Sequence, residues 1–228
     1  QYANLESFIH AKLSLARLVD DKLLDSWSAY LSTWVQSVLA APLVFNIKLS
    51  DLKQTAYFSE MQFYFSVKHY QAARFNSLLS KHLDTTTNID FSSFEGHLKG
   101  AIDLVFEAND QFYILDYKSN YLGNTPSDYQ TESLALAMEE HRYDVQYVIY
   151  TLALHRFLKQ RRKALYDYER DLGGVIYLFL RGLNIDSESE TQAIVSSVSN
   201  EQTLPTGVYF IKPSAELILT LDEEVGRL

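Results

Sequence analysis

Residues 101–118 read AIDLVFEANDQFYILDYK, two apolar runs separated by an Asn-Asp pair. The runs are rich in aliphatic and aromatic residues that favour β-strands. Asn109 and Asp110 both tolerate left-handed backbone angles, so they predict a two-residue turn that joins the strands into a hairpin. However, two aspartates and a lysine lie inside the apolar runs, where an uncompensated charge is costly to bury. The hairpin therefore needs something that compensates these charges.

The predicted turn fixes which residues of the hairpin face each other. Counting outward from a two-residue turn places Asp103 directly opposite Asp116, with their Cβ atoms about 5 Å apart. Lys118 is two residues beyond Asp116 and points to the same face of the sheet. A register slip of one residue would put the aspartates on opposite faces, so this grouping depends on the turn.

Two ionised carboxylates this close require either a shared proton or a cation between them. Ligands that are all oxygens favour a hard ion such as Mg²⁺, which also binds substrate phosphate oxygens. Lys118 could orient or deprotonate a water molecule, or neutralise developing charge. The pattern therefore has the parts for metal-assisted phosphodiester hydrolysis. Spacing alone leaves open a structural ion pair of Lys118 with Asp103 or Asp116 on a solvated sheet face.

Composition narrows the class of protein. The chain has 228 residues, of which 47% are hydrophobic, a net charge of −9 and no cysteine, so a disulfide framework and a cysteine zinc site are excluded. No apolar run reaches the roughly 18 residues of a membrane helix, which fits a cytoplasmic protein without a membrane partner. The acidity argues against tight solitary DNA binding, but not against a domain that receives DNA from a basic partner. The first residue is Gln1, so we expect a piece cut from a longer chain.

Periodicity predicts a single α/β domain over residues 1–228, without an internal repeat. A helix is expected at 25–40 with its tryptophans in the core, and a second helix from the Thr125-Pro126-Ser127-Asp128 cap to Glu140. The other predicted elements are a strand at 57–68, a short helix or loop after it, a helix at 143–163, a buried strand at 175–180 after a Gly-Gly break, an exposed loop at 184–204, a strand at 207–212 and a C-terminal helix.

The order of Asp103, a hairpin and then Asp116-Tyr117-Lys118 resembles the PD-(D/E)xK nuclease motif. The wider segments KGAIDLVF, YILDYKSNYLG, HRYDVQYVIYTLALHRFL and GGVIYLFLRG are similar to the C-terminal nuclease domains of the RecB family, the β subunits of exodeoxyribonuclease V. The similarity runs almost continuously from about Lys99 to Gly182. It implies a restriction-endonuclease-like core, with a mixed central sheet flanked by helices and the hairpin at its centre.

The resemblance also implies roles for individual residues. It makes Asp103 and Asp116 the metal-binding aspartates, with the backbone carbonyl of Tyr117 as a further ligand, and Lys118 the catalytic lysine. It adds Gln146 and Tyr150 from the helix motif of the family; their spacing of four independently places both on one helix face. Without the resemblance, Gln146 would be interpreted as a surface residue and Tyr150 as core packing.

The family supplies one more metal ligand, a histidine on a helix before the first aspartate. Judged from the Trp27 helix, it should fall just upstream of Gln1, and His10 is the nearest candidate inside the chain. Without that histidine we expect weaker metal binding and weak or absent cleavage. The resemblance also suggests an acidic residue near Glu60 that helps to hold the site from a third strand.

Other charged residues carry weaker predictions. His97 is expected at the surface, and His141 and His155 are expected to be solvated or stacked on neighbours. The basic run at 159–163 predicts either phosphate contacts with DNA or a solvated helix end.

At the level of function, the resemblance implies a Mg²⁺-dependent exodeoxyribonuclease domain of a helicase–nuclease that acts in double-strand-break repair and recombination. The implied partners are single- and double-stranded DNA ends, RecC-like and RecD-like subunits and a recombinase. One alternative is a nuclease fold kept as a docking module for those partners, with little or no catalysis. Another is a related nuclease with iron–sulfur cysteines, which the absence of cysteine argues against.

Overall fold

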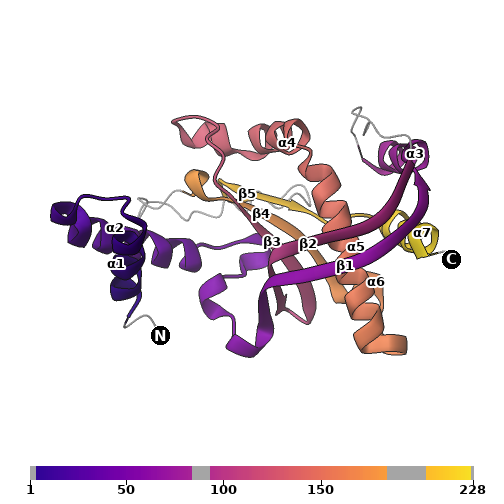
Figure 1. Ribbon diagram of the computed structural model, residues 1–228, viewed down its shortest axis with the longest axis horizontal. Helices are drawn as coiled ribbons and strands as arrows, with labels where there is room; N and C mark the ends of the chain where they lie inside the picture. The colour runs from indigo at the N-terminus through magenta and orange to yellow at the C-terminus, as the bar shows by residue number, and fades with distance from the viewer. Residues whose placement is uncertain (1–3, 84–92, 184–203, 227–228) are drawn as a thin grey trace, which may run out of the picture.

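A computed structural model describes residues 4–83, 93–183 and 204–226, and its centre is one five-stranded mixed sheet. The strand order is β1-β2-β3-β4-β5, in which only β3 and β4 are parallel neighbours. The predicted mixed sheet is confirmed, and the hairpin β2–β3 lies at its centre (Figure 1). The strands are β1 (Tyr57–Gln71), β2 (Ser93–Ala108), β3 (Gln111–Lys118), β4 (Leu172–Phe179) and β5 (Val208–Ile211).

Helices cover both faces of this sheet. On one face, Val105 and Ile114 share a core with residues of α5 and α7, such as Leu152. On the other face, Phe106 and Leu115 pack in a second core with Val38 of α2 and its neighbours. The helices are α1 (Leu5–Ala16), α2 (Leu24–Ala40), α3 (Ala72–His82), α4 (Thr131–Glu140), α5 (Tyr143–Arg162), α6 (Tyr168–Asp171) and α7 (Ala215–Gly226).

The hairpin turn forms as the sequence predicts. Asn109 and Asp110 have φ angles of 51° and 61°, the positive values that a tight two-residue hairpin turn requires. Ala108 pairs with Gln111, and the same register continues to the pair of Leu104 and Leu115. Asp103 and Asp116 are the residues that come directly after this last pair on β2 and β3.

The predicted break at Gly173-Gly174 is wrong, because both glycines lie inside the fully buried strand β4. A Cβ on Gly173 would stand 2.3 Å from the ring of Tyr113, and one on Gly174 would stand 2.5 Å from the ring of Phe210. The glycines therefore make room for two aromatic rings, and Gly174 also has a φ of 145° that other residues rarely adopt.

The N-terminal helices α1 and α2 form a hairpin at one end of the molecule, far from α7 at the other end (Figure 1). The predicted helix at 25–40 is confirmed, but its tryptophans are not both in the core. Trp34 packs against the core, whereas Trp27 is 44% exposed. The reason is that only the C-terminal half of α2 reaches the sheet, and α1 has no buried residue.

One predicted helix differs from the structure at its start. The capping box of Thr125 and Asp128 forms, but it starts the short 3₁₀ helix Pro126–Tyr129. Gln130 is extended, and α4 begins only at Thr131, so the predicted single helix is divided in two. The predicted loop at 184–204 lies almost wholly outside the described residues.

No single helix in the described ranges combines the length and apolarity needed to cross a membrane. By length and composition alone, one bent pair, Asp21–Ala40 with Val44–Asp51, passes that test together, with an angle of 98° between its two parts.

Candidate active site

The site begins at the end of the hairpin that lies away from its turn. Asp103 in β2 uses its Oδ2 atom to accept a hydrogen bond of 2.9 Å from the backbone N–H of Tyr117 in β3. Asp103 is half-buried, whereas Asp116 is only 3% exposed. The register that the turn imposes therefore brings the two carboxylates to adjacent strands, one of them deep in the protein.

Lys118 is the direct partner of Asp116. Its Nζ atom lies 2.7 Å from Asp116 Oδ2, and both side chains are buried. Burial raises the pKa of Asp116, the hydrogen bond and charge of Lys118 lower it, and the charge of Asp103 raises it further. The net pKa of Asp116 is above its usual value. One ammonium group therefore does not compensate fully for burying this carboxylate beside another.

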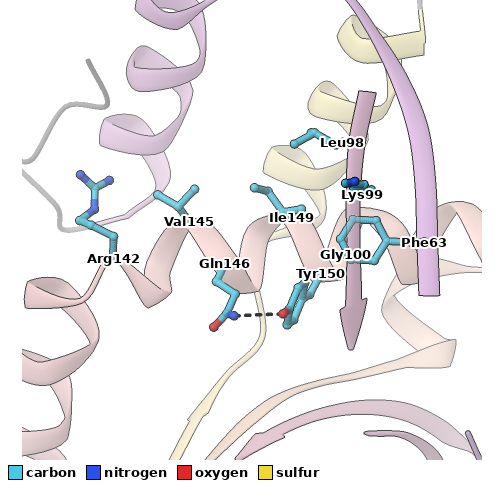
Figure 2. Close-up of a pocket in the computed structure, with 9 residues that line it drawn as sticks. All are labelled: Phe63, Leu98, Lys99, Gly100, Arg142, Val145, Gln146, Ile149 and Tyr150. Carbon is cyan, nitrogen blue, oxygen red and sulfur yellow. Dashed lines mark hydrogen bonds between the residues drawn. The ribbon is translucent and has the colours of Figure 1, made fainter. Parts of the chain in front are cut away.

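Helix α5 supplies the next two predicted residues. The Lys118 ammonium donates to Gln146 Oε1 at 3.0 Å, and Gln146 Nε2 donates to the Tyr150 hydroxyl at 3.0 Å (Figure 2). Burial is the main cause that raises the pKa of Tyr150, followed by the charge of Asp116. A continuous polar network thus runs from Asp116 to Tyr150.

Glu60 approaches the same network from β1. It is exposed, and its φ of 52° interrupts the strand opposite Asp103. Ser59 pairs with Leu104 and Met61 pairs with Ile102, two residues of β2 that pack in different cores. Glu60 therefore lies where the regular alternation of side chains between the two faces of the sheet is interrupted. The charge of Glu60 also helps to raise the pKa of Tyr150. The described geometry therefore places Glu60 within electrostatic reach of the site.

A hollow of about 570 Å³ opens next to this network, between the β1–β2 pair and α5 (Figure 2). Gln146 and Tyr150 form part of its wall. The remaining wall is mostly apolar, with two cationic side chains; its other lining residues are Phe63, Leu98, Lys99, Gly100, Arg142, Val145 and Ile149. An open hollow lined by aromatic rings and cations suits a single strand of nucleic acid. Its bases could stack on the rings, and its phosphates could approach the positive charges.

The oxygen atoms of the site fit a hard divalent cation. Asp103 on β2 lies close enough to Asp116 on β3 to raise its pKa, and the buried Asp116 lacks full charge compensation. Mg²⁺ is often bound by one or two carboxylates with water and substrate phosphate completing its shell. Within residues 4–83, 93–183 and 204–226, no group of three or more His, Cys, Asp or Glu side chains is arranged to hold a metal ion. A cation here would depend on carbonyl, water or phosphate oxygen in addition to the carboxylates.

No histidine among the described side chains belongs to a group of three or more His, Cys, Asp or Glu that could hold a metal ion. His10 lies on α1, with its Nε2 atom 3.3 Å from Asp25 Oδ1 of α2, away from the hairpin. His97 is exposed and stacks on Tyr64, as predicted for a surface residue. His141 stacks on Tyr143.

For His155, the structure supports contact with neighbouring rings rather than solvation, because its ring centroid lies 5.3 Å from that of Tyr166. His155 is 2% exposed in α5, and its Nδ1 atom lies 3.0 Å from the Tyr166 hydroxyl. It belongs to an ionic cluster with Asp222 of α7, in which Lys159 also takes part. Within the basic run, Lys159 and Arg162 are paired with acidic residues of the chain, which favours a structural role for those two positions.

Two residues of the network were missed by sequence reasoning. Tyr143 places its ring 3.8 Å from Lys118 Nζ. Tyr177 is paired with Asp116 across β3 and β4, and its hydroxyl donates to Gln146 Oε1 at 3.1 Å. Tyr143 precedes Gln146 by three residues and so shares its helix face, a signal that was present in the sequence. Tyr177 lies in a buried strand and carries no such signal.

Comparisons with known proteins identify the family of this chain. The family model of the PD-(D/E)XK nuclease superfamily matches residues 3–214. RecBCD enzyme subunit RecB of Haemophilus influenzae is 40% identical over 202 residues, which cover 87% of this chain and 15% of that protein. RecBCD enzyme subunit RecB of Escherichia coli is 41% identical over 202 residues, 86% of this chain and 16% of that protein. The matched region is therefore a small part of these much longer relatives.

Proposed function

Because the chain belongs to the PD-(D/E)XK nuclease superfamily, we propose that it is a RecB-type nuclease domain that hydrolyses DNA phosphodiester bonds with Mg²⁺. Nucleases of this superfamily are generally dependent on divalent metal ions. The observation that carries the proposal is the continuous network from Asp116 through Lys118 and Gln146 to Tyr150, with Asp103 on the adjoining strand. A structural ion pair on a solvated sheet face would not require these buried partners.

In the proposed mechanism, Asp103, Asp116 and the backbone carbonyl of Tyr117 hold the cation. When bound, Mg²⁺ supplies charge stabilisation for the phosphate and acidifies a water molecule. Lys118 orients the attacking water and neutralises charge that develops on the phosphate. Gln146 fixes the ammonium group of Lys118 by accepting its hydrogen bond. Preorganised charge of this kind typically contributes a factor of about 10² to 10³ per group.

The substrate in this proposal is the end of a DNA strand, which lies in the hollow beside Gln146 and Tyr150. The proposal includes exonucleolytic cleavage, a role in double-strand-break repair and recombination, and assembly with RecC-like and RecD-like subunits or a recombinase. The relatives are named as subunit RecB of the RecBCD enzyme, which supports assembly with other subunits. The net charge of −9 supports delivery of DNA by such partners rather than capture by this chain alone.

The test is Mg²⁺-dependent cleavage of linear single-stranded DNA by this chain, by a form extended upstream through the expected histidine, and by the Lys118→Ala variant of each. Lys12→Ala, on the distant helix α1, is the matched control. We expect the extended form to cleave, Lys118→Ala in that form to lose at least about 100-fold in rate, and Lys12→Ala to cleave normally.

A docking module is the second candidate, and one feature of the structure favours it. The α1–α2 hairpin exposes large apolar side chains; these include Phe8, Leu15, Leu18, Leu23, Trp27 and Tyr30. Exposed apolar patches often mark surfaces that bind other proteins. If no form cleaves DNA and Mg²⁺ does not raise the thermal stability of any of them, the nuclease proposal fails and the docking role remains.

A further inference from the structure

The Lys118 side chain is enclosed more completely than an ion pair with Asp116 requires. Its Nζ atom lies 3.8 Å from the ring centroid of Tyr143 and 5.2 Å from that of Tyr177, and the residue is 9% exposed. Gln146 Oε1 accepts a hydrogen bond from the same ammonium. An aromatic face attracts a cation through its quadrupole, and this attraction strengthens where water is excluded.

The two tyrosine rings are themselves held in place by several contacts. They stack at 5.7 Å with an interplanar angle of 18°. The Tyr143 hydroxyl donates to Asn120 Oδ1 at 3.2 Å. The Tyr177 hydroxyl is shared between the backbone carbonyl of Tyr143 at 3.2 Å and Gln146 Oε1 at 3.1 Å. The rings thus tie β4 to the first turn of α5 around the lysine.

We infer that Tyr143 and Tyr177 form an aromatic cage that positions the Lys118 ammonium for catalysis. The inference rests on the proposed function, because it assigns residues to the same site. Asp116 cannot be the sole anchor of Lys118 if its oxygens also bind a cation. A tyrosine ring does not compete for Mg²⁺, whose preferred ligands are carboxylate, carbonyl and water oxygens, so the cage keeps its hold on the flexible lysine side chain.

The two tyrosines contribute in different ways. Tyr143 acts through its ring, which faces Lys118 Nζ at the shorter distance. Tyr177 acts mainly through its hydroxyl, because that group donates to Gln146 Oε1 and turns this oxygen, rather than the amide nitrogen, toward Lys118. Substitutions that keep the ring but remove the hydroxyl therefore separate the two roles.

The kinetic test uses the form of the chain that cleaves DNA and compares Tyr143→Phe, Tyr143→Leu and Tyr177→Phe. We expect Tyr143→Leu to lower kcat about tenfold or more while KM for DNA changes less than about twofold, since a displaced lysine affects the transition state more than substrate binding. Tyr143→Phe keeps the ring and should restore most of kcat, whereas Tyr177→Phe should lower it by roughly threefold or more. Tyr64→Leu, at an exposed position of β1, is the matched control.

A second measurement needs neither metal nor activity. A proton close to the face of an aromatic ring resonates upfield, so the Lys118 Cε–Hε signal of the 228-residue chain should be shifted upfield in the wild type and in Tyr143→Phe. It should return toward the position of an exposed lysine in Tyr143→Leu. Lys118→Ala assigns the signal by removing it.

The outcomes separate the cage from the proposed function. Cleavage that requires Lys118 but is unchanged in folded Tyr143→Leu would overturn the cage alone. An Hε signal that does not respond to Tyr143→Leu would also overturn it. If no form cleaves DNA, the proposed function fails and takes the catalytic role of the cage with it. Loss of kcat in Tyr143→Leu, recovery in Tyr143→Phe and the matching signal shifts would support both.

Discussion

Helix α5 packs beside two carboxylates, the buried Asp116 near its first turns and the partly buried Asp222 near its other end. Asp116 has one cation, Lys118, and a second carboxylate close by. Asp222 lies 2.7 Å from Arg156 Nε, 2.7 Å from Lys159 Nζ and 3.4 Å from His155 Nε2. The surroundings of the two carboxylates therefore differ in how much positive charge the chain itself provides.

The pKa shifts follow that difference. The pKa of Asp222 is well below its usual value, mainly because of the contact with His155 Nε2 at 3.4 Å, with hydrogen bonds from Lys159 and Arg156 adding to it against the effect of burial. The pKa of Asp116 is raised because burial outweighs Lys118. The carboxylate that joins α5 to α7 is thus fully compensated by cations of the chain, whereas at the hairpin Lys118 does not fully compensate for the burial of Asp116 beside Asp103. That shortage is what a divalent cation would satisfy, so the comparison distinguishes a structural cluster from a functional site.

The largest expected effect is on catalysis at the hairpin. Asp116→Asn keeps the shape of the side chain but removes the charge that holds the cation, so we expect DNA cleavage to fall at least about 100-fold. The melting temperature should change by only a few degrees, because the variant removes an incompletely compensated charge as well as the partner of Lys118. Cleavage assays and thermal scans on the same preparation measure both. A variant whose melting temperature falls sharply, but which cleaves normally below its melting transition, would reverse the assignment.

Asp222→Asn should have the opposite profile. It leaves His155, Arg156 and Lys159 close together without their anion, which we expect to cost about 2 kcal/mol of stability, or roughly 4–8 °C in melting temperature. Cleavage measured well below the melting transition should remain near that of the wild type, since Asp222 lies outside the site. Loss of cleavage in a folded Asp222→Asn protein would mean that this cluster is not merely structural.

The pH dependence of stability sharpens the same contrast. Because the pKa of Asp222 is lowered in the folded chain, its contribution is fully present above the unfolded value of about 3.9 and is lost as pH falls below it. The contribution of Asp116 to stability changes with pH in the opposite direction. Because its pKa is raised in the folded chain, the folded state is favoured while Asp116 is protonated and is disfavoured as pH rises and the carboxylate ionises. The difference in melting temperature between wild type and Asp222→Asn should therefore be largest above about pH 5 and shrink below about pH 4. A difference that grows on acidification would contradict a lowered pKa for Asp222.

Sequence reasoning was strongest where local chemistry sets geometry. Asn109 and Asp110 fix the turn, the turn fixes the register, and the register brings Asp103 and Asp116 together. The spacing of four between Gln146 and Tyr150 likewise gives a shared helix face without knowledge of the fold. The roles of these residues came from the resemblance and stay proposals until the variants are measured.

It was weakest where contacts depend on distant pairing. Tyr177 looks like an ordinary residue of a buried strand, and it reaches the site only because β4 pairs in parallel with β3 and places it beside Asp116. His155 meets Asp222 only after α7 packs on α5. Trp27 follows helical periodicity, but the helix extends past the sheet and leaves it exposed. Periodicity predicts which face of a helix or strand is buried, but not which residues pack against that face.

The smallest expected effect concerns an exposed ion pair on the same helix as Asp222. Glu216 of α7 lies 2.5 Å from Lys81 of α3, and the two side chains are 63% and 61% exposed. The pKa of Glu216 is lowered mainly by the hydrogen bond from Lys81, yet water and salt screen a pair this exposed. Glu216→Gln should therefore leave the melting temperature within about 1 °C of the wild type. If Glu216→Gln lowered the melting temperature as much as Asp222→Asn, weaker packing of α7 on the rest of the protein would explain both results. Asp222 would then no longer be a valid contrast to Asp116.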